Sequence, residues 1–105
     1  MTARKKPTRF EFRMKFKLGK IVVTRAVNDL IADNDDFAEH VFLSLNRHLT
    51  GDWGEICAED KETNEVALLD GERLFSAYTK EELPPIWIIT ERDRSVTTIL
   101  FPDEY

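Results

Sequence analysis

The stretch from Ile86 to Pro102 constrains the fold most, because it holds two strand patterns joined by a short charged turn. Its first part, residues 86–89, is an unbroken apolar run, which is typical of a strand that is covered on both faces. Its second part, residues 96–101, is rich in β-branched residues, as a partner strand would be. The stretch therefore predicts the centre of an antiparallel sheet.

The segment near the N-terminus predicts a further strand. Large apolar side chains alternate with charged ones over residues 10–18, which is the period of a half-buried strand. Gly19 interrupts this pattern, and residues 21–23 form a second apolar run. We expect either a hairpin through residues 18–20 or one long bent strand.

Three helices are expected in the middle of the chain. Thr24 is suited to cap a short helix over residues 24–31, and a second helix is predicted from about Asp36 to Arg47. The apolar stripe of the second helix recurs at helical spacing and comprises Phe37, Ala38, Val41, Phe42 and Leu45. The third helix is predicted from roughly Trp53 to Leu69.

The remaining segments complete the fold class. Residues 73–78 alternate like a strand, and residues 79–85 predict a polar loop closed by two prolines. Helices followed by strands indicate an α+β fold. We expect an antiparallel sheet, built from an N-terminal strand or hairpin and three C-terminal strands, with two to three helices packed on one face.

The length of 105 residues fits a single domain, which we place at residues 10–105 after a disordered basic leader of residues 1–9. No apolar run reaches the roughly 18 residues that a membrane span needs. No apolar segment follows the basic leader, as it would in a signal peptide. Cys57 is the only cysteine, so no internal disulfide can form. These features predict a cytoplasmic protein.

Charge is distributed unevenly along the chain, whose net charge is −5. Residues 1–20 hold eight Lys or Arg and one acid, whereas residues 29–72 hold thirteen Asp or Glu against Arg47 and Lys61. The basic leader is the only part that favours nucleic acid. The acidic middle favours either a solvated surface or a protein partner.

Polar residues interrupt the inward face of the predicted third helix. Trp53, Cys57, Asp60, Asn64 and Leu68 share one face, so we expect Asp60 and Asn64 to be buried. Buried carboxylates and amides need hydrogen-bond partners. The candidate partners are Arg73 and two arginines of the charged turn between the last two predicted strands, Arg92 and Arg94, with Ser95 beside them. This network would either fix the packing of helix on sheet or line a ligand pocket.

A row of carboxylates is expected on the other face of that helix, formed by Asp52, Glu55, Glu59 and Glu62. Such a row can hold a hard cation, imitate a row of phosphates or simply meet solvent. No matching set of ligands lies elsewhere in the sequence, so we expect no metal and no cofactor.

His48 precedes Asp52 and Glu55 by four and seven residues. A histidine beside a carboxylate is the minimum for general acid–base catalysis, although His48 could instead cap carbonyls at its helix end. His40 is expected to be exposed. Cys57 is expected to lie mid-helix in the core.

Several blocks of the sequence resemble a family of small bacterial proteins carried on plasmids and other mobile elements. These blocks are FKLGKIVVT, HLTGDWGEICAEDKETNEVAL, DGERLFSAY and the tail IWIITERDRSVTTILFPDEY, so the resemblance covers about residues 16–105. It implies roles such as blocking host defence or maintaining a plasmid, and it implies no particular enzyme activity. The order of helices before three strands also loosely resembles ribosome-dependent ribonuclease toxins, but the acidic middle argues against RNA binding.

We therefore expect a non-enzymatic, acidic protein-interaction domain that could mimic nucleic-acid charge. The expected binding residues are Asp52, Trp53, Glu55, Glu59, Asp60, Glu62, Asn64, Arg73, Arg92, Arg94 and Ser95. The alternative is an enzyme or ligand-binding domain with a polar pocket around His48, Asp52, Glu55, Asp60 and Arg94. The strand edge at residues 10–17 could also pair with a second copy to give a homodimer.

Overall fold

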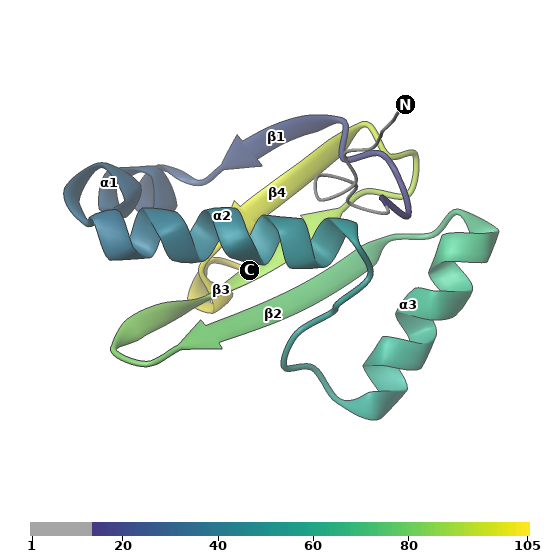
Figure 1. The fold of residues 1–105 in the computed structure, drawn as a ribbon. Coiled ribbons are helices and arrows are strands. Elements are labelled where there is room, and N and C mark those ends of the chain that lie inside the picture. Colours follow the sequence, from purple (N-terminus) through teal and green to yellow (C-terminus); the bar gives the residue numbers. More distant parts are fainter. Residues whose placement is uncertain (1–13) are drawn as a thin grey trace, which may run out of the picture.

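The computed structural model describes residues 14–105 (Figure 1). The basic leader of residues 1–9 and the first part of the expected N-terminal strand lie outside these residues. In chain order the elements are β1 (Lys20–Val23), α1 (Arg25–Asp33), α2 (Asp35–Leu49), α3 (Ala58–Asp70), β2 (Leu74–Lys80), β3 (Leu83–Thr90), β4 (Val96–Leu100) and a 3-10 turn (Pro102–Glu104).

The four strands form one sheet in the order β1-β4-β3-β2. Within the three C-terminal strands, β3 pairs antiparallel with both β2 and β4, as predicted. β1 instead runs parallel to β4, so the sheet is mixed rather than wholly antiparallel. β1 is the expected N-terminal strand, whereas the alternative of a hairpin is wrong because residues 14–19 form no strand. The long connection from β1 to β4, which contains α1 to α3 and two strands, permits this parallel pairing. The fold is α+β.

The helices begin where short polar side chains accept the first backbone N–H groups. Thr24 Oγ1 accepts from Val27 N at 3.3 Å, and Asn34 Oδ1 accepts from Phe37 N at 3.0 Å. Both side chains act as N-caps, which confirms the prediction for Thr24.

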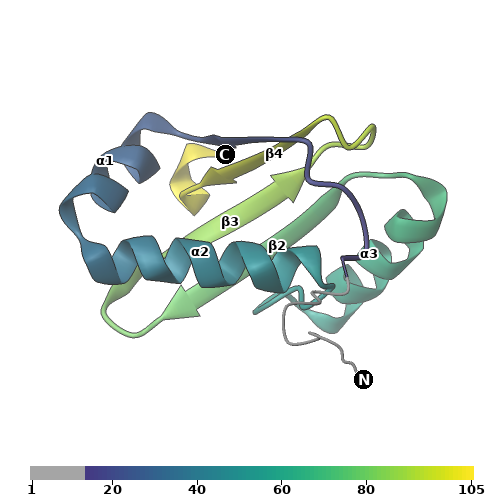
Figure 2. The same cartoon turned by 45° about the horizontal axis from the view of Figure 1, so that its top comes forward.

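α2 lies across one face of the sheet, with α1 at its N-terminal end (Figures 1 and 2). Phe37 and Val41 pack there against strand residues such as Tyr78, Ile86 and Ile88. Phe42 is 62% exposed, so its place in the predicted core stripe is wrong. The inward face instead follows i, i+4, i+7 and i+11 from Phe37, so that Val41, Ser44 and His48 lie inward.

Two local predictions about strands are also corrected. Residues 14–19 form no strand. The predicted polar loop over residues 79–85 is wrong at both ends, because β2 runs to Lys80 and β3 starts at Leu83, which leaves a turn of residues 81–82. Pro84 and Pro85 lie where the pairing of β2 with β3 shifts register. Proline is tolerated at such an irregularity, because no ladder hydrogen bond is required of it there.

The central run of residues 86–89 is only partly covered on both faces. Ile86 and Ile88 are fully buried beneath the helices, and Ile89 is buried on the opposite face, where Trp87 is half-buried. No α-helix lies on that opposite face within residues 14–105 (Figure 2), and Tyr105, which follows the 3-10 turn, packs there against Trp87 with ring centroids 5.6 Å apart. Among the same residues, no helix is both long and apolar enough to cross a membrane.

Candidate functional site

The third helix starts five residues later than predicted, at Ala58. The segment before it is extended and lies along β2, where Glu55 N donates to Ala77 O at 2.7 Å and Ala77 N donates to Trp53 O at 3.3 Å. These long-range bonds hold Trp53–Glu55 out of the helix. Cys57 is therefore exposed rather than in the core, and its Sγ accepts from Asp60 N as the N-cap.

The late start of α3 changes the predicted polar network. Asp60 is exposed at the first turn of the helix, so its predicted burial is wrong. Asn64 is buried as predicted, but its partner is the β2 backbone rather than an arginine. Its Nδ2 donates to Phe75 O at 2.7 Å, and its Oδ1 accepts from Phe75 N at 3.2 Å.

Asn64 is one part of a closed edge along the outer side of β2. Trp53 and Glu55 bond the backbone of Ala77, and the Glu55 carboxylate accepts from Thr79 N at 2.8 Å. The Asn64 amide thus takes the place that the backbone of a further strand would take beside Phe75. Successive outward-facing backbone groups of β2 are satisfied in this way, which prevents a further strand from pairing there.

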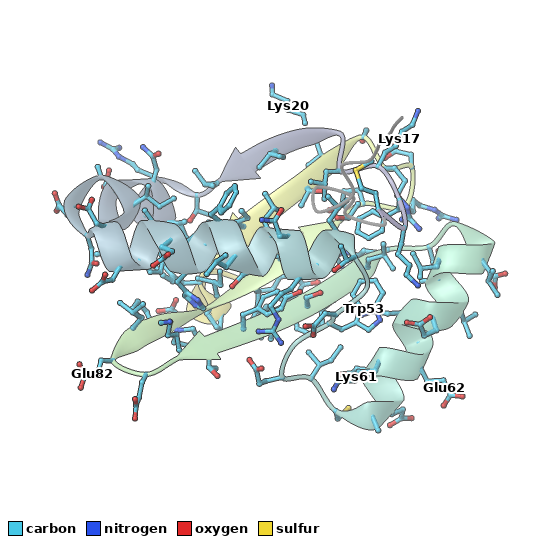
Figure 3. The ribbon with its side chains drawn as sticks, viewed as in Figure 1. Lys17, Lys20, Trp53, Lys61, Glu62 and Glu82 are labelled. Atoms are coloured by element: carbon cyan, nitrogen blue, oxygen red, sulfur yellow. The ribbon has the colours of Figure 1, made fainter. Side chains whose placement is uncertain are left out.

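Trp53 is a structural anchor of this edge. Its side chain is buried with Ala67 and Leu74 in a small second core between β2 and α3. Its indole N–H donates to Glu65 Oε2 at 2.8 Å, and its ring stacks on that of Phe16 at 6.3 Å. Figure 3 shows Trp53 in this position between β2 and α3. A buried and bonded indole of this kind offers little area to a ligand.

Asp52 and Glu55 do not belong to a helical row, because both precede α3. Arg47 on α2 binds them instead, with Nε 2.7 Å from Asp52 Oδ2 and Nη2 3.7 Å from Glu55 Oε2. The hydrogen bond from Arg47 lowers the pKa of Asp52 below its usual value. These side chains are about half exposed, so each pair contributes only about 0–1 kcal/mol of stability. The predicted row of four carboxylates on one helix face is therefore wrong.

His48 lies at the centre of a buried polar chain beneath α2. Its Nδ1 is 2.6 Å from Ser76 Oγ, and its Nε2 is 2.9 Å from Thr90 Oγ1. Thr90 Oγ1 is 2.7 Å from Thr97 Oγ1, which donates to Leu18 O at 2.7 Å. Because the Thr97 proton is directed to Leu18, Thr90 must donate to Thr97. His48 must then carry its proton on Nε2 and accept from Ser76.

This geometry does not assemble the acid–base site predicted around His48. The His48 side chain is fully buried, and burial, with the Arg94 charge as a lesser cause, lowers its pKa to about 3. Its ring is therefore neutral at physiological pH, and its hydrogen-bond partners are hydroxyls rather than Asp52 or Glu55. His40 is also buried, contrary to expectation, and burial lowers its pKa as well.

The charged turn between β3 and β4 contacts α3 through Arg94, as the sequence predicted. Arg94 Nη2 donates to Ala67 O at 3.1 Å, and Nη1 donates to Glu72 O at 2.6 Å. Ala67 O lies in the last turn of α3, where it also accepts from Gly71 N at 2.9 Å, and Glu72 O lies just beyond the helix. Arg94 therefore fixes the C-terminal end of α3 to the sheet.

The other predicted turn residues serve local contacts. Arg92 reaches Glu72 at 3.4 Å, and Ser95 Oγ donates to Asp93 Oδ1 at 2.6 Å. Arg73 lies on the helix-free face of the sheet and donates to Tyr105 Oη at 2.8 Å. A shallow hollow of about 250 Å³ opens there, and it is lined by Arg73, Phe75, Trp87, Ile89 and Tyr105.

Two predicted site residues, Glu59 and Glu62, lie exposed on the outer side of α3 beside residues that were not predicted. We call this the α3 face, defined by Glu59, Glu62, Val66, Leu69 and Glu72. Val66 is 51% exposed and Leu69 is 87% exposed. Neither Glu59 nor Glu62 has an ion-pair partner among residues 14–105. A shallow hollow of about 370 Å³ lies between these glutamates, Val66 and Glu72.

Sequence reasoning found Glu59 and Glu62 of this face but missed Val66, Leu69 and Glu72. The signal that could have exposed them is the weak amphipathicity of residues 58–70, in which only Asn64 and Ala67 are buried. Sequence reasoning also missed the hydroxyls of Ser76, Thr90 and Thr97. Their polar positions within apolar strand patterns were the available sign.

Comparisons of the chain with protein-family models, curated proteins and solved structures find no match. Within residues 14–105, no three His, Cys, Asp or Glu side chains are placed to hold a metal ion. The fold and the described surface define a small α+β domain with an acidic, partly apolar helix on its outside.

Proposed function

We propose that this chain is a non-enzymatic protein-interaction domain that binds a basic partner surface through the α3 face. The observation that carries the proposal is the pairing of free carboxylates with exposed apolar side chains on one helix. Exposed apolar groups beside charge are typical of protein-interaction sites. Free glutamates add electrostatic attraction to a cationic partner.

The packing of α3 supports this proposal. Asn64 and Ala67 are its only buried residues, so most of the helix surface is turned to solvent. Figure 1 shows α3 beyond β2, at the opposite side of the sheet from β1. The bonds from Asn64 and Arg94 hold the helix at its middle and its end, so the α3 face is presented in a fixed orientation.

The resemblance to proteins of mobile elements suggests what the partner is. A nucleic-acid-binding protein of the host presents a basic surface, and the α3 face has the opposite charge. We propose charge mimicry by Glu59 and Glu62, whose carboxylates have no ion-pair partner among residues 14–105. These two glutamates replace the longer row that includes Asp52 and Glu55. The enzyme alternative has less support, because His48 is enclosed and its hydrogen bonds are all to hydroxyls.

The experiment is affinity capture from a bacterial lysate with the immobilised full chain. A partner should be retained by the wild type, released at high salt and lost when Glu59→Lys and Glu62→Lys are combined. The matched control combines Glu81→Lys with Glu82→Lys at the β2–β3 turn, far from Glu62 (Figure 3). Retention of the same protein by both variants would contradict the proposal, as would loss in both.

A further inference from the structure

The outer edge of β1 is an open strand edge. Lys20 N donates to Ser95 O at 2.8 Å, and Thr24 N donates to Ile99 O at 3.1 Å. Backbone groups of a strand alternate in direction, so the N–H and C=O groups of Ile21 and Val23 point away from β4. β1 is the last strand of the sheet (Figure 1), and no described element pairs with its outer side.

The side chains along this edge leave it accessible. Ile21 is 48% exposed and Val22 is 37% exposed, on opposite faces of the strand. An added strand would therefore gain backbone hydrogen bonds together with an apolar contact on each face of the sheet. This combination defines recognition by strand addition, in which backbone bonds supply affinity and neighbouring side chains supply selectivity.

The charged residues around β1 determine which kind of added peptide strand its edge favours. Residues 14–25 contain four cations and no acid, namely Lys15, Lys17, Lys20 and Arg25. All four are exposed, and none forms an ion pair within residues 14–105. Figure 3 shows Lys17 and Lys20 directed outward at the start of β1. Arg25 follows its end, so cations flank the open edge on both sides.

We propose that the open edge of β1 binds an extended peptide segment that carries acidic residues on both sides of a short apolar core. A second copy of this chain fits less well. Antiparallel pairing of two β1 strands would bring Lys20 of one copy towards Arg25 of the other, and like charges across a strand pair are destabilising. This surface lies across the sheet from the α3 face, so the two proposals are independent.

The test uses the full chain and three synthetic peptides with the same alternating Thr-Val core. One peptide carries Asp at both ends, one carries Lys at both ends, and one is the Asp peptide with N-methylated amides on the edge that would pair. Binding is followed by amide hydrogen exchange and chemical shifts in NMR spectra. We expect the Asp peptide to bind about tenfold or more tightly than the Lys peptide and to slow exchange at Ile21 and Val23. The N-methylated peptide should lose binding.

Charge-reversed variants provide the matched control. Lys20→Glu combined with Arg25→Glu should reverse the preference, so that the Lys peptide binds more tightly. Lys61→Glu lies on α3 and should leave the preference unchanged. The proposal is overturned if the Asp peptide does not bind, or if it binds no better than the Lys peptide. Slow amide exchange at Ile21 and Val23 in the free protein would also overturn the proposal. Slow exchange that does not depend on protein concentration would show that the chain's own residues cover the edge. Slow exchange that becomes more pronounced with protein concentration would show that a second copy covers it.

Discussion

The two outer strands of the sheet, β1 and β2, differ in how their free edges are treated. The outer backbone groups of β2 are bonded by the Asn64 amide, by the Trp53–Glu55 backbone and by the Glu55 carboxylate. Those of β1 meet no described partner, and its side chains are largely exposed. An unpaired edge invites another strand, and proteins normally block or shorten it. The difference indicates that strand addition is prevented at β2, whereas no residue within 14–105 prevents it at β1.

Glycine allows close backbone approach beside each of these strands. Gly54 has a positive φ of 76°, and a Cβ there would collide with Ala77 O and the Tyr78 ring. Gly19 has a φ of 67°, and a Cβ there would collide with the carbonyls of Arg94 and Ser95. Gly54 thus permits closure of the β2 edge, whereas Gly19 permits β1 to join β4.

The largest expected effect is that of Gly54→Ala, which tests whether the β2 edge depends on this close approach. Because the new Cβ would meet backbone, we expect the free energy of unfolding to fall by about 3 kcal/mol or more. Gly71→Ala is the matched control, since Gly71 has a similar φ of 73° but no atom within 4 Å of its Cβ position. It should lose only about 1–2 kcal/mol. The measurement is urea unfolding, and equal losses of stability in the two variants would contradict a role for the close contact of Gly54 with Ala77.

The next effect is that of Asn64→Ala, which opens the β2 edge without touching its backbone. The N–H and C=O of Phe75 lose their partners, so we expect a loss of about 2–3 kcal/mol and faster amide exchange at Phe75. Thr63→Ala, at the exposed neighbouring position, should change stability by less than about 1 kcal/mol. If the Phe75 amide stays protected in Asn64→Ala, the edge is closed by something other than this side chain.

A smaller effect concerns acid, because the His48 chain links Ser76 on β2 to Leu18 before β1. The folded state holds the pKa of His48 near 3, whereas an unfolded histidine titrates near 6.5. The contribution of neutral His48 to the free energy of unfolding is thus fully present above about pH 6.5, and it is lost as the pH falls towards 3. The expected loss is about 2 kcal/mol between pH 7 and pH 5.

The matched variant is His48→Gln, whose amide can accept from Ser76 and donate to Thr90 but does not titrate in this range. Urea unfolding at pH 7 and pH 5 should show a smaller pH dependence in the variant than in the wild type. His40→Gln should remove a separate part of the dependence, because burial lowers the pKa of His40 too. An unchanged pH dependence in His48→Gln would contradict the assignment of the titrating group.

The candidate site could be predicted only in part, because the sequence shows which residues need partners but not where those partners lie. Asn64 stood out as a polar residue on an inward face, and Arg94 was one of three arginines expected as its partner, with Arg73 and Arg92. The structure brings Asn64 to the backbone of Phe75 and Arg94 to the carbonyl of Ala67. Backbone groups are present at every position, so no residue type in the sequence marks them as the partners.

The sequence by itself determined the features that depend on neighbouring residues. The cap at Thr24 and the three C-terminal strands follow from side chains that act within a few positions of themselves. Tertiary structure decided the parallel pairing of β1, the burial of His48 and the start of α3. Each of these depends on contacts between distant segments, such as Glu55 with Ala77, whose hydrogen bonds outweigh the local preference for a helix. The same long-range pairing decided that the outer edge of β2 is closed.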